Sequence, residues 1–269
     1  MDQKTKAEAF GALHTGAEIL VLPNAWDAAS AAVMADAGAK AVATSSAAVA
    51  WSHGYPDGDA LPLPLLLGTI AAVARVVSVP VTADIEGGYT DHLGQLGETI
   101  KAVIEAGAVG INLEDGRRDP DLHARKVEAA RKAADATGVP LFINARTDVY
   151  LKGLAEGDAA YTETVQRAER YRSAGASGVF VPGPSDEALI GRLAEAIELP
   201  LNIMLLPGLA NAARLQALGV RRISSATAPF RAAYATVAKA TAAFLADGDP
   251  RAFAAGAEGL GNLNKRFET

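Results

Sequence analysis

The chain has 269 residues, with 25 Lys and Arg against 31 Asp and Glu, so it carries a net charge of −6 and has a pI near 5.3. This acidic balance argues against a sequence-independent nucleic-acid binder, because contacts to phosphates need a basic surface. Cysteine is absent, which excludes disulfides, thiolate metal sites and cysteine nucleophiles. We therefore expect small-molecule partners and no nucleic acid.

The first residues show no targeting signal, because they mix charges without an apolar core, and we expect a cytoplasmic protein. Segment 61–81 is almost wholly apolar and long enough to reach across a bilayer. Pro62, Pro64, Arg75 and Pro80 interrupt it, and a buried helix that leads into a buried strand explains the same composition. We expect no membrane association.

Eight short apolar runs predict β-strands along the chain. They cover residues 19–23, 41–45, 79–85, 109–113, 141–145, 178–181, 201–205 and 222–225. The runs are continuously apolar rather than alternating, as is typical of parallel strands covered on both faces. Alanine-rich segments with helical spacing lie between them, among them 97–106, 122–136, 162–174, 186–196 and 210–218.

This alternation predicts an α/β protein with one (β/α)8 TIM-barrel domain over residues 1–269. A short helix precedes the first predicted strand, and extra helices follow the eighth. A doubly wound open sheet is the alternative, because the strand and helix pattern does not itself prove closure. No Gly-x-Gly-x-x-Gly follows the first predicted strand, which favours the barrel.

Chemistry in such a barrel lies at the carboxyl ends of the strands. Seven of the eight predicted strands carry polar residues there or nearby, and only 178–181 lacks them. The set comprises Asn24, Asp27, Thr44, Ser45, Ser46, Asp84, Glu86, Asn112, Glu114, Asp115, Asn144, Arg146, Asp148, Asn202, Ser224 and Ser225.

Three of these residues predict a metal site. Asp84 and Glu86 are two residues apart and so point the same way from a strand, and Glu114 follows on the next strand at a similar height. Three carboxylates without thiols or a histidine cluster suit Mg²⁺ or Mn²⁺. The alternative is that these acids form ion pairs with arginines.

Arg146 is the only basic residue at a predicted strand end, and its planar guanidinium suits a substrate carboxylate. Neutralisation of Asp148 or of the acidic cluster is the alternative. No lysine lies on a predicted strand, which argues against a Schiff-base aldolase. Ser45 and Ser46 are candidates to donate hydrogen bonds to an oxyanion, and Asp57 is a candidate to support the metal.

Six segments together resemble the isocitrate lyase/phosphoenolpyruvate mutase superfamily. They are LPNAWDAASA (22–31), ATSSAAVAWSHGYPDG (43–58), VPVTADIEGGY (79–89), GINLEDG (110–116), FINARTDVYL (142–151) and APFRAAY (228–234). The resemblance implies a (β/α)8 barrel, Mg²⁺, and homodimers or homotetramers that exchange C-terminal helices. It also implies carbon–carbon or phosphorus–carbon chemistry on small 2-oxo acids or dicarboxylates through a pyruvate-enolate-like intermediate.

Carried over by position, the resemblance assigns Asp84, Glu86 and Glu114 to the metal. It implies catalytic roles for Arg146, Glu114 and Asp57. The substrate contacts that it implies are Trp26, Thr44, Ser45, Ser46, Ala47, Arg146, Asn202 and Arg231.

Two departures narrow the expected activity. Superfamily lyases that cleave isocitrate carry a catalytic cysteine on a long gating loop, whereas this chain has no cysteine and only residues 116–121 at that place. The same deletion removes the Lys and Asn of the phosphonomutases, and Gly183 stands where a polar residue is usual. We therefore expect a Mg²⁺-dependent lyase that decarboxylates oxaloacetate or a related 2-oxo diacid, and not a true isocitrate lyase. The alternatives are hydrolytic cleavage of the same substrate class and a non-catalytic 2-oxo-acid binding protein.

Overall fold

A computed structural model describes residues 1–268 of the chain. Nine strands form one sheet in which every pairing is parallel. They are β1 (Leu20–Leu22), β2 (Asn24–Ala25), β3 (Val42–Thr44), β4 (Val81–Asp84), β5 (Gly110–Glu114), β6 (Phe142–Arg146), β7 (Gly178–Val181), β8 (Leu201–Met204) and β9 (Arg222–Ser224).

The sheet closes into a barrel through a split first strand. β1 and β2 lie at opposite ends of the strand order, yet only Pro23 separates them in the chain. Proline has no N–H for a strand ladder, and here β1 pairs with β9 while β2 pairs with β3. The predicted (β/α)8 barrel is confirmed, and the open-sheet alternative is wrong.

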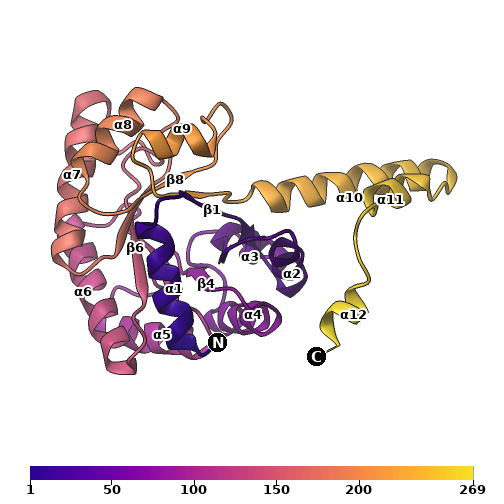
Figure 1. Ribbon diagram of the computed structural model, residues 1–269, viewed down its shortest axis with the longest axis horizontal. Coiled ribbons are helices and arrows are strands. Elements are labelled where there is room, and N and C mark those ends of the chain that lie inside the picture. The colour runs from indigo at the N-terminus through magenta and orange to yellow at the C-terminus, as the bar shows by residue number, and fades with distance from the viewer. Residues whose placement is uncertain (269) are drawn as a thin grey trace.

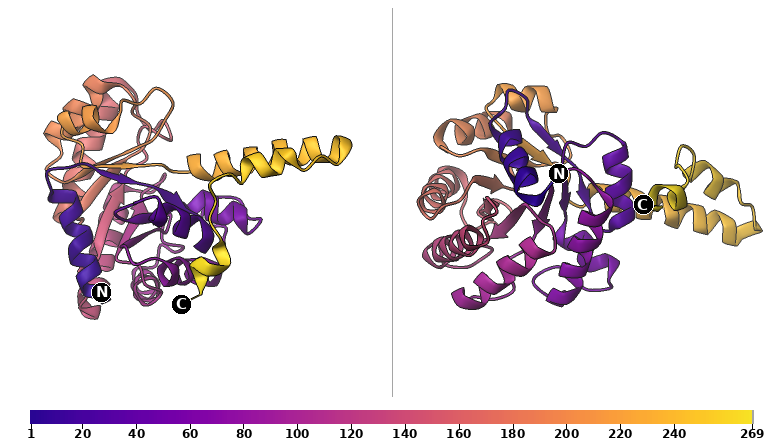
Figure 2. Two further views of the ribbon diagram at one scale, coloured as in Figure 1. Left: turned by 45° about the vertical axis from the view of Figure 1, so that its right-hand side comes forward. Right: turned by 60° about the horizontal axis from the view of Figure 1, so that its bottom comes forward.

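Helices alternate with the strands, and most of them surround the barrel (Figures 1 and 2). They are α1 (Gln3–Thr15), α2 (Ala28–Asp36), α3 (Ser46–Ser52), α4 (Leu63–Val76), α5 (Leu93–Glu105), α6 (Pro120–Thr137), α7 (Gly157–Ser173), α8 (Glu187–Ala196), α9 (Ala212–Ala217), α10 (Ala228–Asp247), α11 (Arg251–Gly256) and α12 (Leu263–Phe267). The apolar segment 61–81 is α4 followed by the start of β4, as predicted. No helix within residues 1–268 is long and apolar enough to cross a membrane.

The N-terminal helix α1 packs against the amino-terminal end of the barrel strands. Its Phe10 and His14 rings both contact the ring of Phe142 at the start of β6. Gly110, at the start of β5, leaves room for this packing, because a Cβ there would lie 2.6 Å from the Phe10 ring. With that end covered, the carboxyl ends of the strands are left for a site.

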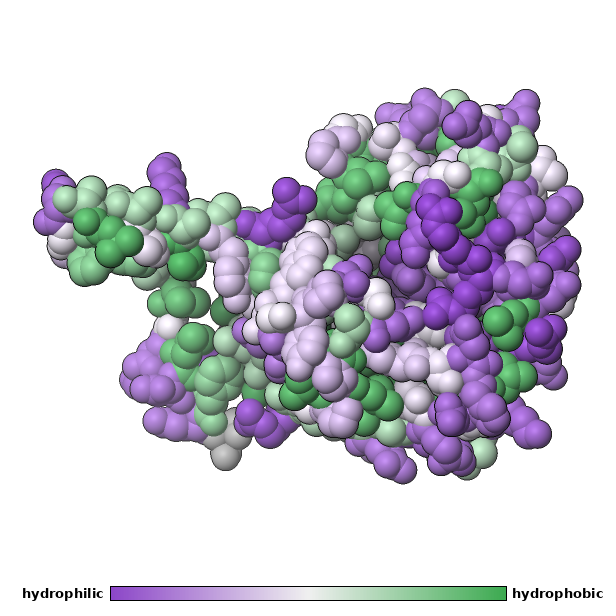
Figure 3. All heavy atoms as spheres, turned by 180° about the vertical axis from the view of Figure 1, so that it is seen from behind, coloured by the Kyte–Doolittle hydropathy of each residue, from purple (hydrophilic) through white to green (hydrophobic). Residues whose placement is uncertain are grey.

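The C-terminal helices leave the barrel. Figure 1 shows α10 projecting outward with α11 folded back on it, and the turned view in Figure 2 agrees. The chain then returns, and Arg266 of α12 pairs with Asp36 of α2 at 2.8 Å. The arm formed by α10 and α11 exposes large side chains with apolar surface, and Figure 3 shows green atoms along it. They are Tyr234, Val237, Phe244, Leu245 and Phe253.

Candidate active site

The carboxyl ends of the barrel strands enclose a cavity of about 150 Å³. It is lined by Asn24, Ser45, Ser46, Ala47, Asp57, Asp84, Asn112, Arg146, Leu151, Phe180, Met204, Ser224, Ala226 and Thr227. A larger groove of about 570 Å³ lies beside β1 and the end of α2, where the only charged lining residues are Glu18 and Lys40. We place the candidate site in the smaller cavity, because the polar strand ends converge there.

Asp84 ends β4 and reaches the cavity from a buried position. Its backbone N–H donates to Thr44 Oγ1 at 2.9 Å, and its Oδ1 accepts from the Glu86 N–H at 3.1 Å. Burial raises the pKa of Asp84, and the nearby charge of Asp57 raises it further, while Arg146 opposes the shift. Within residues 1–268, no cationic side chain lies within 4.0 Å of this carboxylate.

Glu86 points away from the cavity. Its φ of 51° is left-handed, so the alternation of side chains along β4 ends at Asp84. The Glu86 carboxylate accepts from the Gly58 N–H at 2.7 Å and from the Asp59 N–H. Burial is the main cause that raises the pKa of Glu86 to about 7. Its position indicates that it holds the loop after α3, rather than a cation in the cavity.

Glu114 pairs with a neighbouring strand. The register places it opposite Arg146, and its Oε2 lies 2.8 Å from Arg146 Nη1. Lys152 Nζ approaches the same carboxylate at 3.7 Å. Arg146 also donates from Nε to Asp148 Oδ1 at 2.6 Å. Burial raises the pKa of Glu114 to about 7, with Arg146 opposing it.

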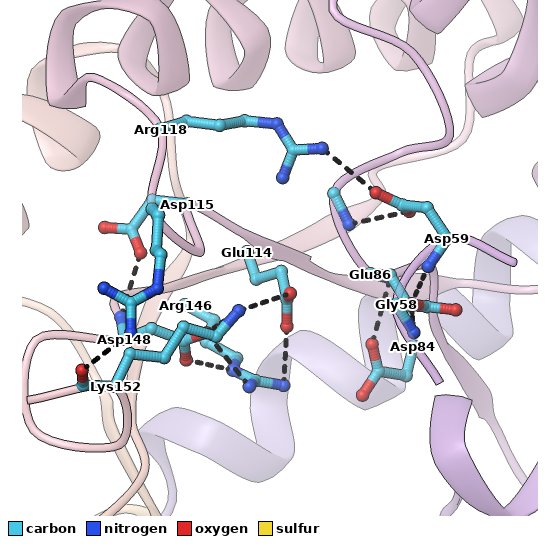
Figure 4. Close-up of polar contacts among 12 residues, drawn as sticks. Gly58, Asp59, Asp84, Glu86, Glu114, Asp115, Arg118, Arg146, Asp148 and Lys152 are labelled. Atoms are coloured by element: carbon cyan, nitrogen blue, oxygen red, sulfur yellow. Dashed lines mark hydrogen bonds and ion pairs between the residues drawn. The ribbon is translucent and has the colours of Figure 1, made fainter. Parts of the chain in front are cut away.

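The structure therefore does not bring Asp84, Glu86 and Glu114 together. Within residues 1–268, no three His, Cys, Asp or Glu side chains come together in a way that could hold a metal ion. Figure 4 shows the acids in two groups, one around Arg146 and one around Asp84 and Asp59. Glu114 instead forms an ion pair with an arginine, which is the alternative given for these acids in the sequence. Arg146 fits both of its predicted roles, because it neutralises Glu114 and Asp148 and also lines the cavity.

Some of the predicted substrate contacts line the cavity and others do not. Ser45, Ser46 and Ala47 line the cavity, and Asp57 reaches it from the loop after α3. Thr44 instead supports Asp84 from beneath. Three further predicted contacts, like Thr44, do not line the cavity: Trp26 packs on Phe230, Asn202 bonds Ser224 Oγ inside the barrel at 3.1 Å, and Arg231 is exposed on α10.

Sequence reasoning missed one wall of the cavity and one buried cation. Leu151, Phe180 and Met204 form an apolar part of the cavity wall between the ends of β6 and β8, and the Arg146 guanidinium lies 5.7 Å from the centre of the Phe180 ring. Arg222 lies buried within the barrel. Its sequence signal is a charged residue inside a predicted buried strand, at its first position.

The donors that line the cavity fit a hard cation. Asp84 is a buried carboxylate that has no cationic partner among residues 1–268, and Asp57 repels it from the same cavity. Both groups offer oxygen ligands, with the Ser45 and Ser46 hydroxyls close by. Mg²⁺ commonly takes only one or two protein carboxylates and keeps waters, so this smaller set suffices.

Comparison with known proteins gives one consistent family. The phosphoenolpyruvate phosphomutase family model matches residues 10–245. An uncharacterized protein of Mycobacterium tuberculosis is 36% identical over 89% of this chain and 90% of its own length. The 2-methylisocitrate lyase of Escherichia coli is 31% identical over 75% of this chain and 70% of its own.

Two further matches bear on the site. The oxaloacetate decarboxylase of Pseudomonas savastanoi is 26% identical over 79% of this chain and 75% of its own. A solved structure from Burkholderia cenocepacia, provisionally described as a phosphonomutase, is 42% identical. It superposes with a TM-score of 0.84 over 87% of this chain and 98% of its own. Their reactions differ, so the chemistry of this chain has to be argued from its own residues.

Proposed function

Because the chain belongs to the phosphoenolpyruvate phosphomutase family, we propose that it is a Mg²⁺-dependent carbon–carbon lyase of small 2-oxo acids that decarboxylates oxaloacetate. The observation that carries this proposal is the two-sided cavity. One part of the wall presents the Asp84 carboxylate, which within residues 1–268 has no cationic side chain within 4.0 Å, and another presents Leu151, Phe180 and Met204, with Arg146 beside Phe180.

The polar side suits the 2-oxo acid end of the substrate. Asp84 and Asp57 would hold Mg²⁺, which when bound supplies a Lewis acid for the oxygens of a 2-oxo acid. Arg146 is held in place by Glu114 and Asp148, so its guanidinium presents its remaining N–H groups to a substrate carboxylate with little loss of side-chain entropy. Ser45 and Ser46 add hydroxyl donors at the same side.

The apolar side suits the carboxylate that leaves. In decarboxylation the C3–C4 bond breaks, its electron pair forms the enolate of pyruvate, and neutral CO₂ departs. An apolar wall favours the loss of charge from the departing group, because it stabilises a carboxylate poorly and CO₂ well. The enolate then takes a proton at C3 from water, so no general acid on the protein is needed.

The loop after β5 supports decarboxylation over cleavage of larger acids. Residues 115–119 alone connect β5 to α6, and Arg118 within them is fixed by Asp59 at 3.0 Å and by Asp91 at 2.8 Å. Decarboxylation suits such a short and fixed segment, because it needs no long loop that brings a proton donor to a leaving carbanion. The oxaloacetate decarboxylase relative agrees with this choice.

The proposal is tested by incubating the purified protein with oxaloacetate, with and without Mg²⁺, and identifying the products. We expect Mg²⁺-dependent formation of pyruvate and CO₂. Oxalate plus acetate would instead assign the hydrolytic reaction. Mg²⁺-dependent binding of oxaloacetate without any product would assign a binding protein.

We further propose that a second copy of this chain covers the exposed arm. Each barrel strand is normally followed by a helix that covers it, yet α10 leaves the barrel after β9, and Val21 of β1 stays 58% exposed beside the 570 Å³ groove. An arm from another copy would bury both apolar surfaces. Light scattering should give a dimer or tetramer that Val237→Glu with Leu245→Glu reduces to a monomer, whereas Lys239→Glu on the same helix should not.

A further inference from the structure

A buried arginine lies inside the barrel beneath the candidate site. Arg222 begins β9 and is 1% exposed. Within residues 1–268, its side chain has one hydrogen bond, from Nη2 to Asn112 Oδ1 at 3.3 Å, while Nε and Nη1 have no partner. Burial lowers the pKa of Arg222 to about 9, and the charge of Asp84 opposes this shift. A guanidinium kept in such a place at the expense of desolvation calls for a role beyond packing.

Asn112 connects this arginine to the candidate site. Its Oδ1 accepts from Arg222 Nη2 and also from Asn144 Nδ2 at 2.9 Å. Because the amide oxygen is taken by two donors, the NH₂ group must point the other way. That other side is the cavity, which Asn112 and Asp84 both line from neighbouring strands.

The register of the strands makes the arrangement direct. Asn112 lies opposite Asp84 on β4 and opposite Asn144 on β6. Arg222 reaches Asn112 across the barrel interior, from β9 to β5, over a sequence separation of 110 residues. Without the Arg222 guanidinium, the hydrogen bond from Asn144 alone would keep the oxygen of the Asn112 amide from turning toward Asp84. The Asp84 carboxylate would repel that oxygen.

We propose that Arg222 is a positioning residue, which fixes the Asn112 amide so that its NH₂ group donates to Asp84 and which places a buried positive charge beneath that carboxylate. The assignment to metal binding rests on the proposed function, whereas the orientation of Asn112 does not. Arg222 touches neither substrate nor metal. Removal of such an outer partner typically lowers metal affinity about 10- to 100-fold.

Arg222→Met tests the proposal, because it retains length while removing charge and donors. Thr82→Val is the matched control: Thr82 is also buried in the barrel interior, and its Oγ1 has no partner within residues 1–268. We expect Mg²⁺ affinity, measured by calorimetry with MgCl₂ alone, to fall about tenfold or more in Arg222→Met and to stay unchanged in Thr82→Val. Combined with Asn112→Ala, Arg222→Met should add little further loss, because both act through one amide. Additive losses would overturn the proposal.

A crystal structure of Arg222→Met gives a readout that needs neither metal nor turnover. At a resolution that distinguishes the amide nitrogen from the amide oxygen, we expect the Asn112 amide to be rotated away from Asp84, and an unchanged amide would overturn the proposal. If oxaloacetate is not turned over by the natural protein while the amide rotates in the variant, the proposed function fails and the positioning role stands.

Should Arg222→Met not fold, Arg222→Lys replaces it. Mg²⁺ affinity between those of the natural protein and Asn112→Ala would support the proposal, and natural affinity would overturn it.

Discussion

The guanidinium of Arg118 lies against the α-carbon of Gly87, so closely that a Cβ on Gly87 would meet Arg118 Nη1. From this position Arg118 bonds Asp59 and Asp91, and Asp91 also binds the buried Lys126 at 2.7 Å. The contacts tie the loops after α3, β4 and β5 to one another. The first of these loops carries Asp57, so the tie holds one wall of the cavity.

Arg118→Ala should loosen that wall while leaving the barrel intact. We expect kcat/KM for oxaloacetate to fall about tenfold, because Asp57 is no longer held, together with faster amide exchange in residues 54–61. Arg117→Ala is the control, since Arg117 is the adjacent exposed arginine and bonds only the Lys152 carbonyl, at 3.4 Å. Equal kinetics and equal exchange in the two variants would contradict a role for the Arg118 tie.

Asp84→Asn should abolish Mg²⁺ binding without destabilising the fold. The substitution keeps the shape of the side chain and removes a buried charge that has no cationic partner within residues 1–268, so we expect a Tm equal to or above that of the natural protein. The loss of affinity should exceed the ~10–100-fold that follows removal of an outer partner. Calorimetry with MgCl₂ measures it, and Asp158→Asn, at an exposed acid, is the control. Mg²⁺ binding that survives in Asp84→Asn would remove Asp84 from the metal site.

The barrel could be predicted because its physical cause is local. Parallel strands buried on both faces are continuous apolar runs, and each run here is followed by a segment with helical spacing. The direction of α10 could not be predicted, because Tyr234, Val237 and Leu245 would read the same on a helix packed against its own barrel as on one that leaves it.

The acids of the site show where sequence reasoning stops. The place of Asp84 at the end of β4 can be predicted from the sequence, but the rule that alternate residues share a face holds only while the strand continues. At Glu86 the backbone is left-handed, and the side chain turns to Gly58 and Asp59 instead. Glu114 was misplaced for another reason: its partner Arg146 lies opposite it in the strand register, which one sequence does not reveal.

Arg146→Lys should weaken substrate far more than metal. Lysine keeps the charge that Glu114 and Asp148 require but lacks the planar fork that bonds both acids and still faces the cavity. We expect kcat/KM to fall about 100-fold while Mg²⁺ affinity changes less than threefold. Arg170→Lys, at a half-exposed pair with Asp121, is the control for the same substitution. A variant whose KM and kcat match those of the natural protein would exclude Arg146 as a substrate contact.

Acid should destabilise the protein through two buried histidines. Burial lowers the pKa of His14 and of His123 from 6.5 to about 3. Below pH 6.5 the unfolded chain therefore binds protons that the folded chain does not, and stability falls as the pH falls from about 6.5 toward 3. At pH 5 each histidine accounts for about 2 kcal/mol of lost stability.

His123 gives the cleaner test of that loss, because neither of its ring nitrogens has a partner within residues 1–268 and its ring packs edge-on against Tyr171. His123→Leu removes the titrating group while keeping an apolar contact with that ring. Urea unfolding at pH 8 measures the packing change alone, since His123 is then neutral in both states. Going from pH 8 to pH 5, we expect the natural protein to lose about 2 kcal/mol more than the variant, and equal losses would show that His123 does not resist protonation.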